Sequence, residues 1–136
     1  FNRKSTLWGS WAIKDKNINI YFSGDTGYGD HFKDIGRDYG PFDLVLLDTG
    51  QYNSAWKYSH MFPFESVRAA KDLNSQFFMP IHWAGFTLSK HPWDEPIKKS
   101  IEYAEKEGMR YIAPMIGEVI SNDELNKNFV EWWNEY

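Results

Sequence analysis

YFSGDTGYG, at residues 21–29, places a single acid among three glycines directly after an apolar run. Just upstream, Ile18, Ile20 and Phe22 alternate with polar neighbours, which is the pattern of a strand with one buried face. The glycines permit the sharp turn that must follow, because glycine adopts positive φ without steric cost. Asp25 is therefore expected just beyond the carboxyl end of a strand, where open α/β sheets place their functional residues.

The composition limits the classes of protein to be considered. The chain has 136 residues, 42% of them hydrophobic and 18% aromatic, which is enough for one modest core. Its formal net charge of -4 argues against a nucleic-acid partner, which would need a basic patch. Without cysteine, a metal site would have to use histidine and carboxylate ligands. No apolar run reaches membrane-spanning length and no signal peptide is recognised, so a cytoplasmic location is expected.

The rest of the sequence alternates between strand and helix patterns. Strands are predicted over 6–13 and 17–22 as a hairpin, and over 42–47 and 76–81 as buried strands. Helices are predicted over 31–39, 63–73 and 94–108, with Asp30 and Asp94 as capping residues. For the tail we expect short strands near 110–113 and 118–120, then a helix from about Asn122. This order predicts one compact α/β unit.

Chemically active side chains follow the predicted strands. Asp25 and His82 each come directly after a strand, and His60 lies in a long aromatic loop over 51–62. If the strands are neighbours, Asp25 and His82 lie close together, and a carboxylate with neutral imidazoles suits zinc, iron or manganese. Taken singly, an acid such as Asp25 is more often a helix cap or turn residue, and a histidine such as His82 is more often a hydrogen-bonded core residue. Asp48 could be a second catalytic carboxylate, but we predict that it is a turn former.

Several short motifs occur in an order typical of one family. They are SGDTGY at 23–28, GPFDL at 40–44, His60 before PFESV at 63–67, and IHW at 81–83. Together they resemble the C-terminal half of the metallo-β-lactamase superfamily, in the branch of N-acylphosphatidylethanolamine-hydrolysing phospholipase D. LWGSW at 7–11 and HPWDEP at 91–96 favour that branch.

The resemblance implies a fold and a dinuclear site. The fold would be α/β, the C-terminal half of an αββα sandwich, with a mixed sheet and helices packed on one face. The complete fold would hold two zinc ions, with manganese or iron as alternatives, and a hydroxide between the ions as nucleophile. Asp25 would bridge the ions, His82 would be the last histidine ligand, and His60 would be a catalytic or substrate-contacting residue. Tyr28 and Trp83 would line the substrate groove, although packing explains each equally well.

The other half of the family's site has no counterpart in this sequence. The His-x-His-x-Asp-His signature is absent, and a further histidine ligand would lie upstream of Phe1. Residues 1–136 are therefore expected to form a single partial domain, completed by a missing N-terminal half or by a second copy of the chain. By itself the chain is expected to bind metal weakly and to be inactive.

Two function hypotheses follow from the sequence. The first is a fragment of a zinc-dependent, phospholipase D-like hydrolase acting on phosphodiester or related ester bonds of a small-molecule or phospholipid-like substrate, with a lactonase-type activity as an alternative. The second is a non-catalytic fragment or interaction module of the same fold. Peripheral contact with a membrane surface, through Trp56 and Tyr58, is a further alternative.

Overall fold

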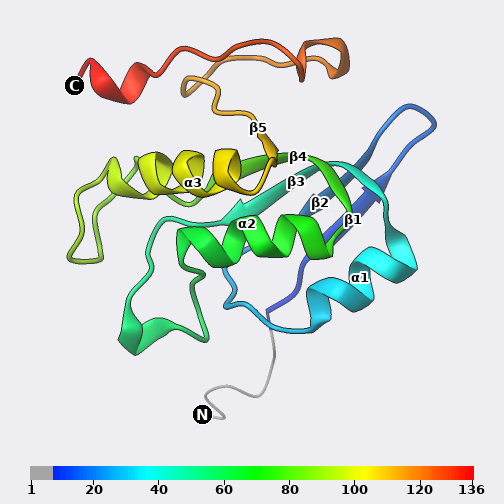
Figure 1. The fold of residues 1–136 in the computed structure, drawn as a ribbon, viewed down its shortest axis with the longest axis horizontal. Coiled ribbons are helices and arrows are strands. Elements are labelled where there is room, and N and C mark those ends of the chain that lie inside the picture. The colour runs from blue at the N-terminus through cyan, green and yellow to red at the C-terminus, as the bar shows by residue number, and fades with distance from the viewer. Residues whose placement is uncertain (1–7) are drawn as a thin grey trace.

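The fold is built on one five-stranded sheet, seen in a computed structural model that describes residues 8–136 (Figure 1). The strands, in their order across the sheet, are β1 (Trp11–Lys14), β2 (Asn19–Phe22), β3 (Phe42–Asp48), β4 (Ser75–Ile81) and β5 (Arg110–Tyr111). β1 pairs antiparallel with β2, and the remaining pairs are parallel. The predicted mixed sheet is thus confirmed, while residues 6–7 of the predicted hairpin lie outside the described residues.

Three α-helices cover one face of the sheet (Figure 1). They are α1 (His31–Tyr39), α2 (Pro63–Asp72) and α3 (Glu95–Lys106), each within a turn of its predicted bounds. Because side chains alternate along a strand, Val45 and Leu47 of β3 point into the core under these helices, together with Phe78 of β4. The main core therefore lies between the helices and this face.

The N-caps of α1 and α3 differ in detail from the prediction. Asp30 and Asp94 occupy the N-cap positions, but neither side chain makes a capping hydrogen bond. Their carboxylates instead pair with Lys33 and Lys98, one turn into each helix. These pairs are exposed, so they add little to stability.

The tail beyond β5 crosses the opposite face of the sheet, and its predicted elements are wrong. In place of a strand near 118–120 and a helix from Asn122, the described chain has only the short 3₁₀ turns Asn122–Glu124 and Trp132–Asn134. Leu125 packs with Leu44 and Phe77, whereas the two tryptophans of the last turn belong to a separate cluster beside α3. An extended segment advances about 3.3 Å per residue against about 1.5 Å for a helix, so it can serve both clusters.

One edge of the sheet exposes apolar side chains. All four residues of β1 are exposed, and Trp11 and Ile13 keep 69% and 55% of their surface accessible. Such an edge can pair with a further strand or pack against another domain. Among residues 8–136, no helix has both the length and the apolar character needed to span a bilayer.

Candidate metal centre

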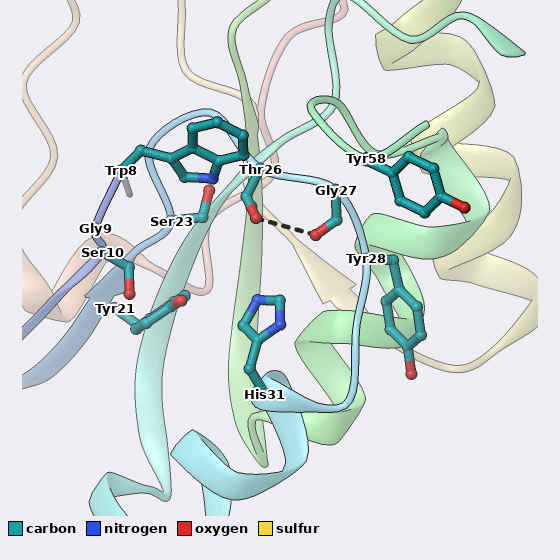
Figure 2. Close-up of a pocket in the computed structure, with 10 residues that line it drawn as sticks. All are labelled: Trp8, Gly9, Ser10, Tyr21, Ser23, Thr26, Gly27, Tyr28, His31 and Tyr58. Atoms are coloured by element: carbon teal, nitrogen blue, oxygen red, sulfur yellow. Dashed lines mark hydrogen bonds between the residues drawn. The ribbon is translucent and has the colours of Figure 1, made fainter. Parts of the chain in front are cut away.

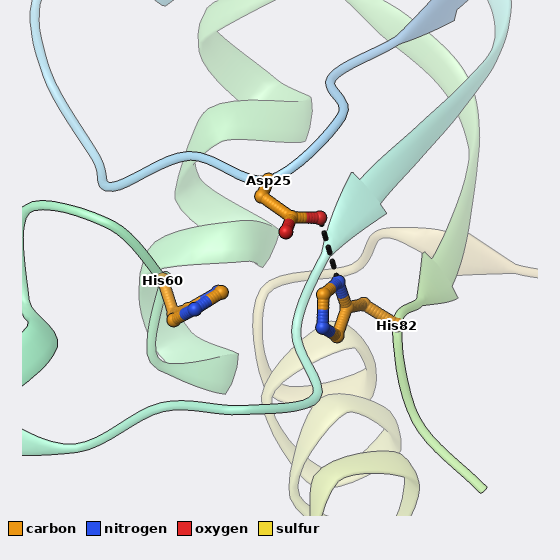
Figure 3. Close-up of side chains that lie close together, drawn as sticks. All are labelled: Asp25, His60 and His82. Atoms are coloured by element: carbon orange, nitrogen blue, oxygen red, sulfur yellow. Dashed lines mark hydrogen bonds and ion pairs between the residues drawn. The ribbon is translucent and has the colours of Figure 1, made fainter. Parts of the chain in front are cut away.

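The candidate site lies at the edge of the sheet where three parallel strands end. Asp25 is in the loop after β2, Asp48 is the last residue of β3, and His82 directly follows β4. Since β2, β3 and β4 are parallel neighbours, their carboxyl ends meet at this edge. His60 reaches the same place from the loop between β3 and α2, as Figure 3 shows.

Asp25, His60 and His82 converge on one small volume (Figure 3). Each residue offers one potential ligand atom, and these atoms all lie within 4.8 Å of one another. Nδ1 of His82 is 2.7 Å from Oδ1 of Asp25, which confirms the predicted approach of these two residues. The rings of His60 and His82 meet edge to face with centroids 5.2 Å apart. A carboxylate and two imidazoles are a donor set that fits a divalent transition-metal ion.

The three side chains differ in their access to solvent. Asp25 keeps 62% of its side-chain surface exposed and His82 28%, whereas His60 keeps 18%. Asp25 and His82 are thus open to solution, while His60 lies deeper in the site. A substrate or ion could reach the pair formed by Asp25 and His82 without rearrangement of the backbone.

Asp48 lies beneath the site and has no exposed surface. Its Oδ2 is 2.9 Å from Nδ1 of His60 and accepts a hydrogen bond from the backbone amide of Thr26. In the described part of the chain, Oδ1 is buried without a hydrogen-bond partner. Burial raises the pKa of Asp48, and the hydrogen bonds from His60 and Thr26 partly offset that rise. The prediction that Asp48 is a turn former is therefore wrong, because Asp48 is the last residue of β3 and its side chain is buried.

His60 is held by its own loop. The side-chain oxygen of Asn53 accepts a hydrogen bond from the backbone amide of Ala55 and caps the start of a 3₁₀ turn over Ser54–Trp56. The amide of His60 then donates to the carbonyl of Trp56, and the next residue, Met61, is fully buried. The backbone on both sides of His60 is thereby fixed.

His82 has an unusual backbone conformation. Its φ is 66°, and Ala84, two residues on, has a φ of 67°. Side-chain-bearing residues rarely adopt this left-handed region, at a cost of about 1–3 kcal/mol each, and such strain tends to occur at functional sites. The turn after β4 thus holds His82 in a conformation that the surrounding structure must maintain.

Tyr28, a predicted substrate-binding residue, is engaged in packing. Its ring stacks on Phe32, its hydroxyl donates to Asp72, and the guanidinium of Arg68 lies 4.7 Å from its ring centroid. Tyr28 lines a pocket of about 380 Å³, shown in Figure 2, whose other walls come from the following residues: Trp8, Gly9, Ser10, Tyr21, Ser23, Thr26, Gly27, His31 and Tyr58. That set includes none of Asp25, His60 and His82, so the pocket lies beside the convergent trio and not over it.

Trp83, the other aromatic residue predicted to contact substrate, lies next to His82. Its ring stacks on Trp132 with centroids 5.2 Å apart, and its Nε1 donates to the carbonyl of Pro80. Trp83 and His82 both line a cavity of about 300 Å³ with largely apolar walls, among them Met79 and Ile116. Trp83 can therefore pack against Trp132 and still present part of its surface to a substrate in this cavity.

A family model described as "Beta-lactamase superfamily domain" matches residues 1–83, a span that includes Asp25, His60 and His82. The chain belongs to the metallo-β-lactamase superfamily. An uncharacterized protein of Mycobacterium tuberculosis is 46% identical over 86% of this chain and 32% of its own length. The outer membrane protein RomA of Klebsiella pneumoniae is 48% identical over 59% of this chain and 61% of its own length.

Relatives from the predicted branch are also similar to this metallo-β-lactamase superfamily chain. N-acyl-phosphatidylethanolamine-hydrolyzing phospholipase D 1 of Caenorhabditis elegans is 39% identical over 60% of this chain and 24% of its own length. The chain thus spans about a third or less of the mycobacterial and nematode relatives.

Solved structures confirm the superfamily fold. The metallo-beta-lactamase fold protein YhfI from Bacillus subtilis matches with a TM-score of 0.57 at 19% identity, over 76% of this chain and 40% of that one. The metallo hydrolase Igni18 from Ignicoccus hospitalis matches with a TM-score of 0.59 at 20% identity, over 76% of this chain and 41% of that one. At such identities the likeness shows the fold alone.

Proposed function

We propose that this chain contributes part of the active site of a zinc-dependent hydrolase, in which Asp25 and His82 bind metal and His60 contacts the substrate. The observation that carries the proposal is the convergence of three potential ligand atoms within 4.8 Å at the end of parallel strands. A relative in Listeria monocytogenes is named a metal-dependent hydrolase, which supports the reaction class. Manganese and iron share the preference for these ligands and are the alternatives to zinc.

Each side chain has a distinct role in the proposal. A divalent ion, when bound, lowers the pKa of water and stabilises the negative charge that develops during ester hydrolysis. Asp25 is exposed enough to offer both carboxylate oxygens, so it can contact two ions. His60 engages Asp48 through Nδ1, which leaves Nε2 for a substrate oxygen or a leaving group.

For the substrate we propose a phosphodiester or related ester, in a small molecule or a phospholipid. Support comes from the phospholipase D relatives, since the yeast mitochondrial one is 35% identical over 82% of this chain and 25% of its own length. The apolar cavity shared by His82 and Trp83 suits an acyl or other apolar group. A lactonase-type activity is the alternative within the superfamily.

A second candidate function is an interaction module of the same fold, without catalysis. The exposed apolar edge at Trp11 and Ile13 favours it, because such an edge suits a partner surface. The partner would be the other half of the fold or a second copy of this chain. Under this hypothesis the partner would bind equally well after metal is removed with a chelator.

Metal titration tests the proposed hydrolase site. We expect Asp25→Asn and His82→Gln each to weaken zinc binding about 10-fold or more, measured by competition with a chromogenic chelator, because each removes a ligand. Asp15→Asn, in the exposed turn between β1 and β2, is the matched control and should bind zinc as the unmodified chain does. If both variants keep the unmodified affinity, the metal site is not where we propose it.

The stoichiometry of the same titration tests the partial-site proposal. Asp25 and His82 together supply two protein ligands, fewer than a complete zinc site has, so one ion would be held weakly. We expect at most one zinc ion per chain, and hydrolysis of bis(p-nitrophenyl) phosphate only after the partner half is supplied. Two tightly bound ions per isolated chain would contradict this.

A further inference from the structure

We propose that Asp48 is a positioning residue that holds His60 with its proton on Nδ1, so that Nε2 keeps its lone pair for the site. The inference rests on the proposed function in one respect, which is that Nε2 of His60 contacts the substrate. The hydrogen bond between Asp48 and His60 does not depend on that function. The inference starts from an acid with no exposed surface, directly after the apolar run over 44–47, whose carboxylate contacts His60. A turn-forming acid would be exposed.

The hydrogen bonds to Asp48 determine where the proton of His60 resides. Oδ2 lies 3.1 Å from the backbone amide of Thr26 and 2.9 Å from Nδ1 of His60. A backbone amide can only donate, so Oδ2 acts as an acceptor. When Asp48 is ionised its oxygens can only accept, so the ring nitrogen that approaches Oδ2 carries the proton. A neutral imidazole has one N–H, and Nε2 is left unprotonated.

The main chain of Asp48 fixes the position of this acceptor. Its amide donates to Oγ of Ser23, and its carbonyl accepts from the hydroxyl of Ser66. Ser23 belongs to the same loop as Asp25, and Ser66 lies on α2. Asp48 is thus tied to the loop of Asp25 and to α2, and its carboxylate to the loop of His60. A group held from three sides can orient an imidazole without moving itself.

Histidine nitrogen chemical shifts test the inference without any bound metal. Long-range ¹H–¹⁵N spectra distinguish a protonated from an unprotonated ring nitrogen, and the signals of His60 are assigned by their loss in His60→Asn. In the metal-free protein we expect His60 as the Nδ1–H form. In Asp48→Asn the amide group can donate to Nδ1, so we expect a shift toward the Nε2–H form.

Asp43→Asn is the matched control, because it makes the same substitution on the same strand. Asp43 lies near the start of β3 and accepts the backbone amide of Asn19 through Oδ2 at 2.7 Å, with no histidine beside it. We expect His60 to keep the Nδ1–H form in this variant. A response of His60 to Asp43→Asn as large as that to Asp48→Asn would mean that the loss of either carboxylate of β3 perturbs the ring, and would overturn the positioning role.

Two further results would also overturn the inference. They are the Nε2–H form of His60 in the unmodified protein, and an unchanged form in Asp48→Asn. Should Asp48→Asn fail to fold, the spectrum of the unmodified protein decides between the two forms by itself. These spectra need no metal. Zinc binding that is unaffected by Asp25→Asn and His82→Gln would therefore count against the proposed function and leave the result for Asp48 intact.

Discussion

Gly50 lies directly against the backbone of His82: a Cβ atom at residue 50 would stand 1.5 Å from the His82 carbonyl oxygen. Only a residue without a side chain fits there, and the strained turn at His82 depends on it. We predict that Gly50→Ala displaces His82, lowers the free energy of unfolding by about 1–3 kcal/mol and weakens zinc binding. Urea denaturation and zinc titration measure the two effects.

Gly85→Ala is the control for Gly50→Ala. Gly85 lies three residues after His82, and an added Cβ would meet no atom within 4 Å. This variant should keep both stability and zinc affinity. The displacement of His82 would be disproved if Gly50→Ala bound zinc as tightly as Gly85→Ala.

Gly27 lies where the loop of Asp25 packs closely against the backbone of the loop of His60. A Cβ atom at residue 27 would stand 2.6 Å from the carbonyl oxygen of Lys57. We predict that Gly27→Ala pushes the loops apart, destabilises the protein by about 1–3 kcal/mol and weakens zinc binding. Gly9→Ala, where an added Cβ meets nothing within 4 Å, should change neither quantity in the same titrations. Equal zinc affinity in both variants would show that the two loops can separate without cost to the site.

Asp25 and His82 could be placed from the sequence because their positions follow from strand ends. His82 directly follows β4, Asp25 lies in the loop just after β2, and parallel neighbouring strands bring such ends together. Asp48 could not be interpreted in this way, because its partners His60 and Thr26 are 12 and 22 residues away in the sequence. An acid before Thr49 and Gly50 has the local pattern of a turn, and only the fold shows it to be buried. The sequence does offer one signal, which is that Asp48 directly follows the apolar run over 44–47.

The tail shows a different limit of sequence analysis. Leu125 and Phe129, with Trp132 or Trp133, are spaced as on one face of a helix, and this spacing predicts a helix. In the structure Leu125 and Phe129 pack on the sheet, while Trp132 packs with Trp83 near α3. Spacing along the chain cannot reveal that apolar residues serve two separate clusters.

Trp132 provides a test of the tail's contribution to stability. Its ring is 6% exposed and stacks on Trp83, the neighbour of His82. We predict that Trp132→Ala lowers the free energy of unfolding by about 3–5 kcal/mol, as expected for a buried tryptophan. Urea denaturation measures the change. Val130→Ala, at a side chain that is 66% exposed, should stay within about 0.5 kcal/mol of the unmodified protein. A loss for Trp132→Ala no larger than that would show that the tail is dispensable.

Tyr28 gives a prediction for stability at high pH. Burial, and then the hydrogen bond to Asp72, raise the pKa of Tyr28 to about 12 from its ordinary value of 10.0. The folded protein therefore keeps a proton that the unfolded chain loses first. Its contribution to stability is complete below pH 10 and is lost as the pH rises toward 12.

Tyr28→Phe should therefore differ most from the unmodified protein below pH 10. Phenylalanine keeps the stacking on Phe32 but cannot donate to Asp72, so this variant is expected to be less stable at pH 8. Near pH 12 the unmodified protein loses the same interaction, and the two stabilities should converge. Urea denaturation across this range measures the gap, with Tyr58→Phe as a control at a side chain that is 77% exposed. A gap that stays constant from pH 8 to pH 12 would mean that the hydroxyl of Tyr28 is not bound to Asp72 in solution, and would restore Tyr28 as a side chain free to contact substrate.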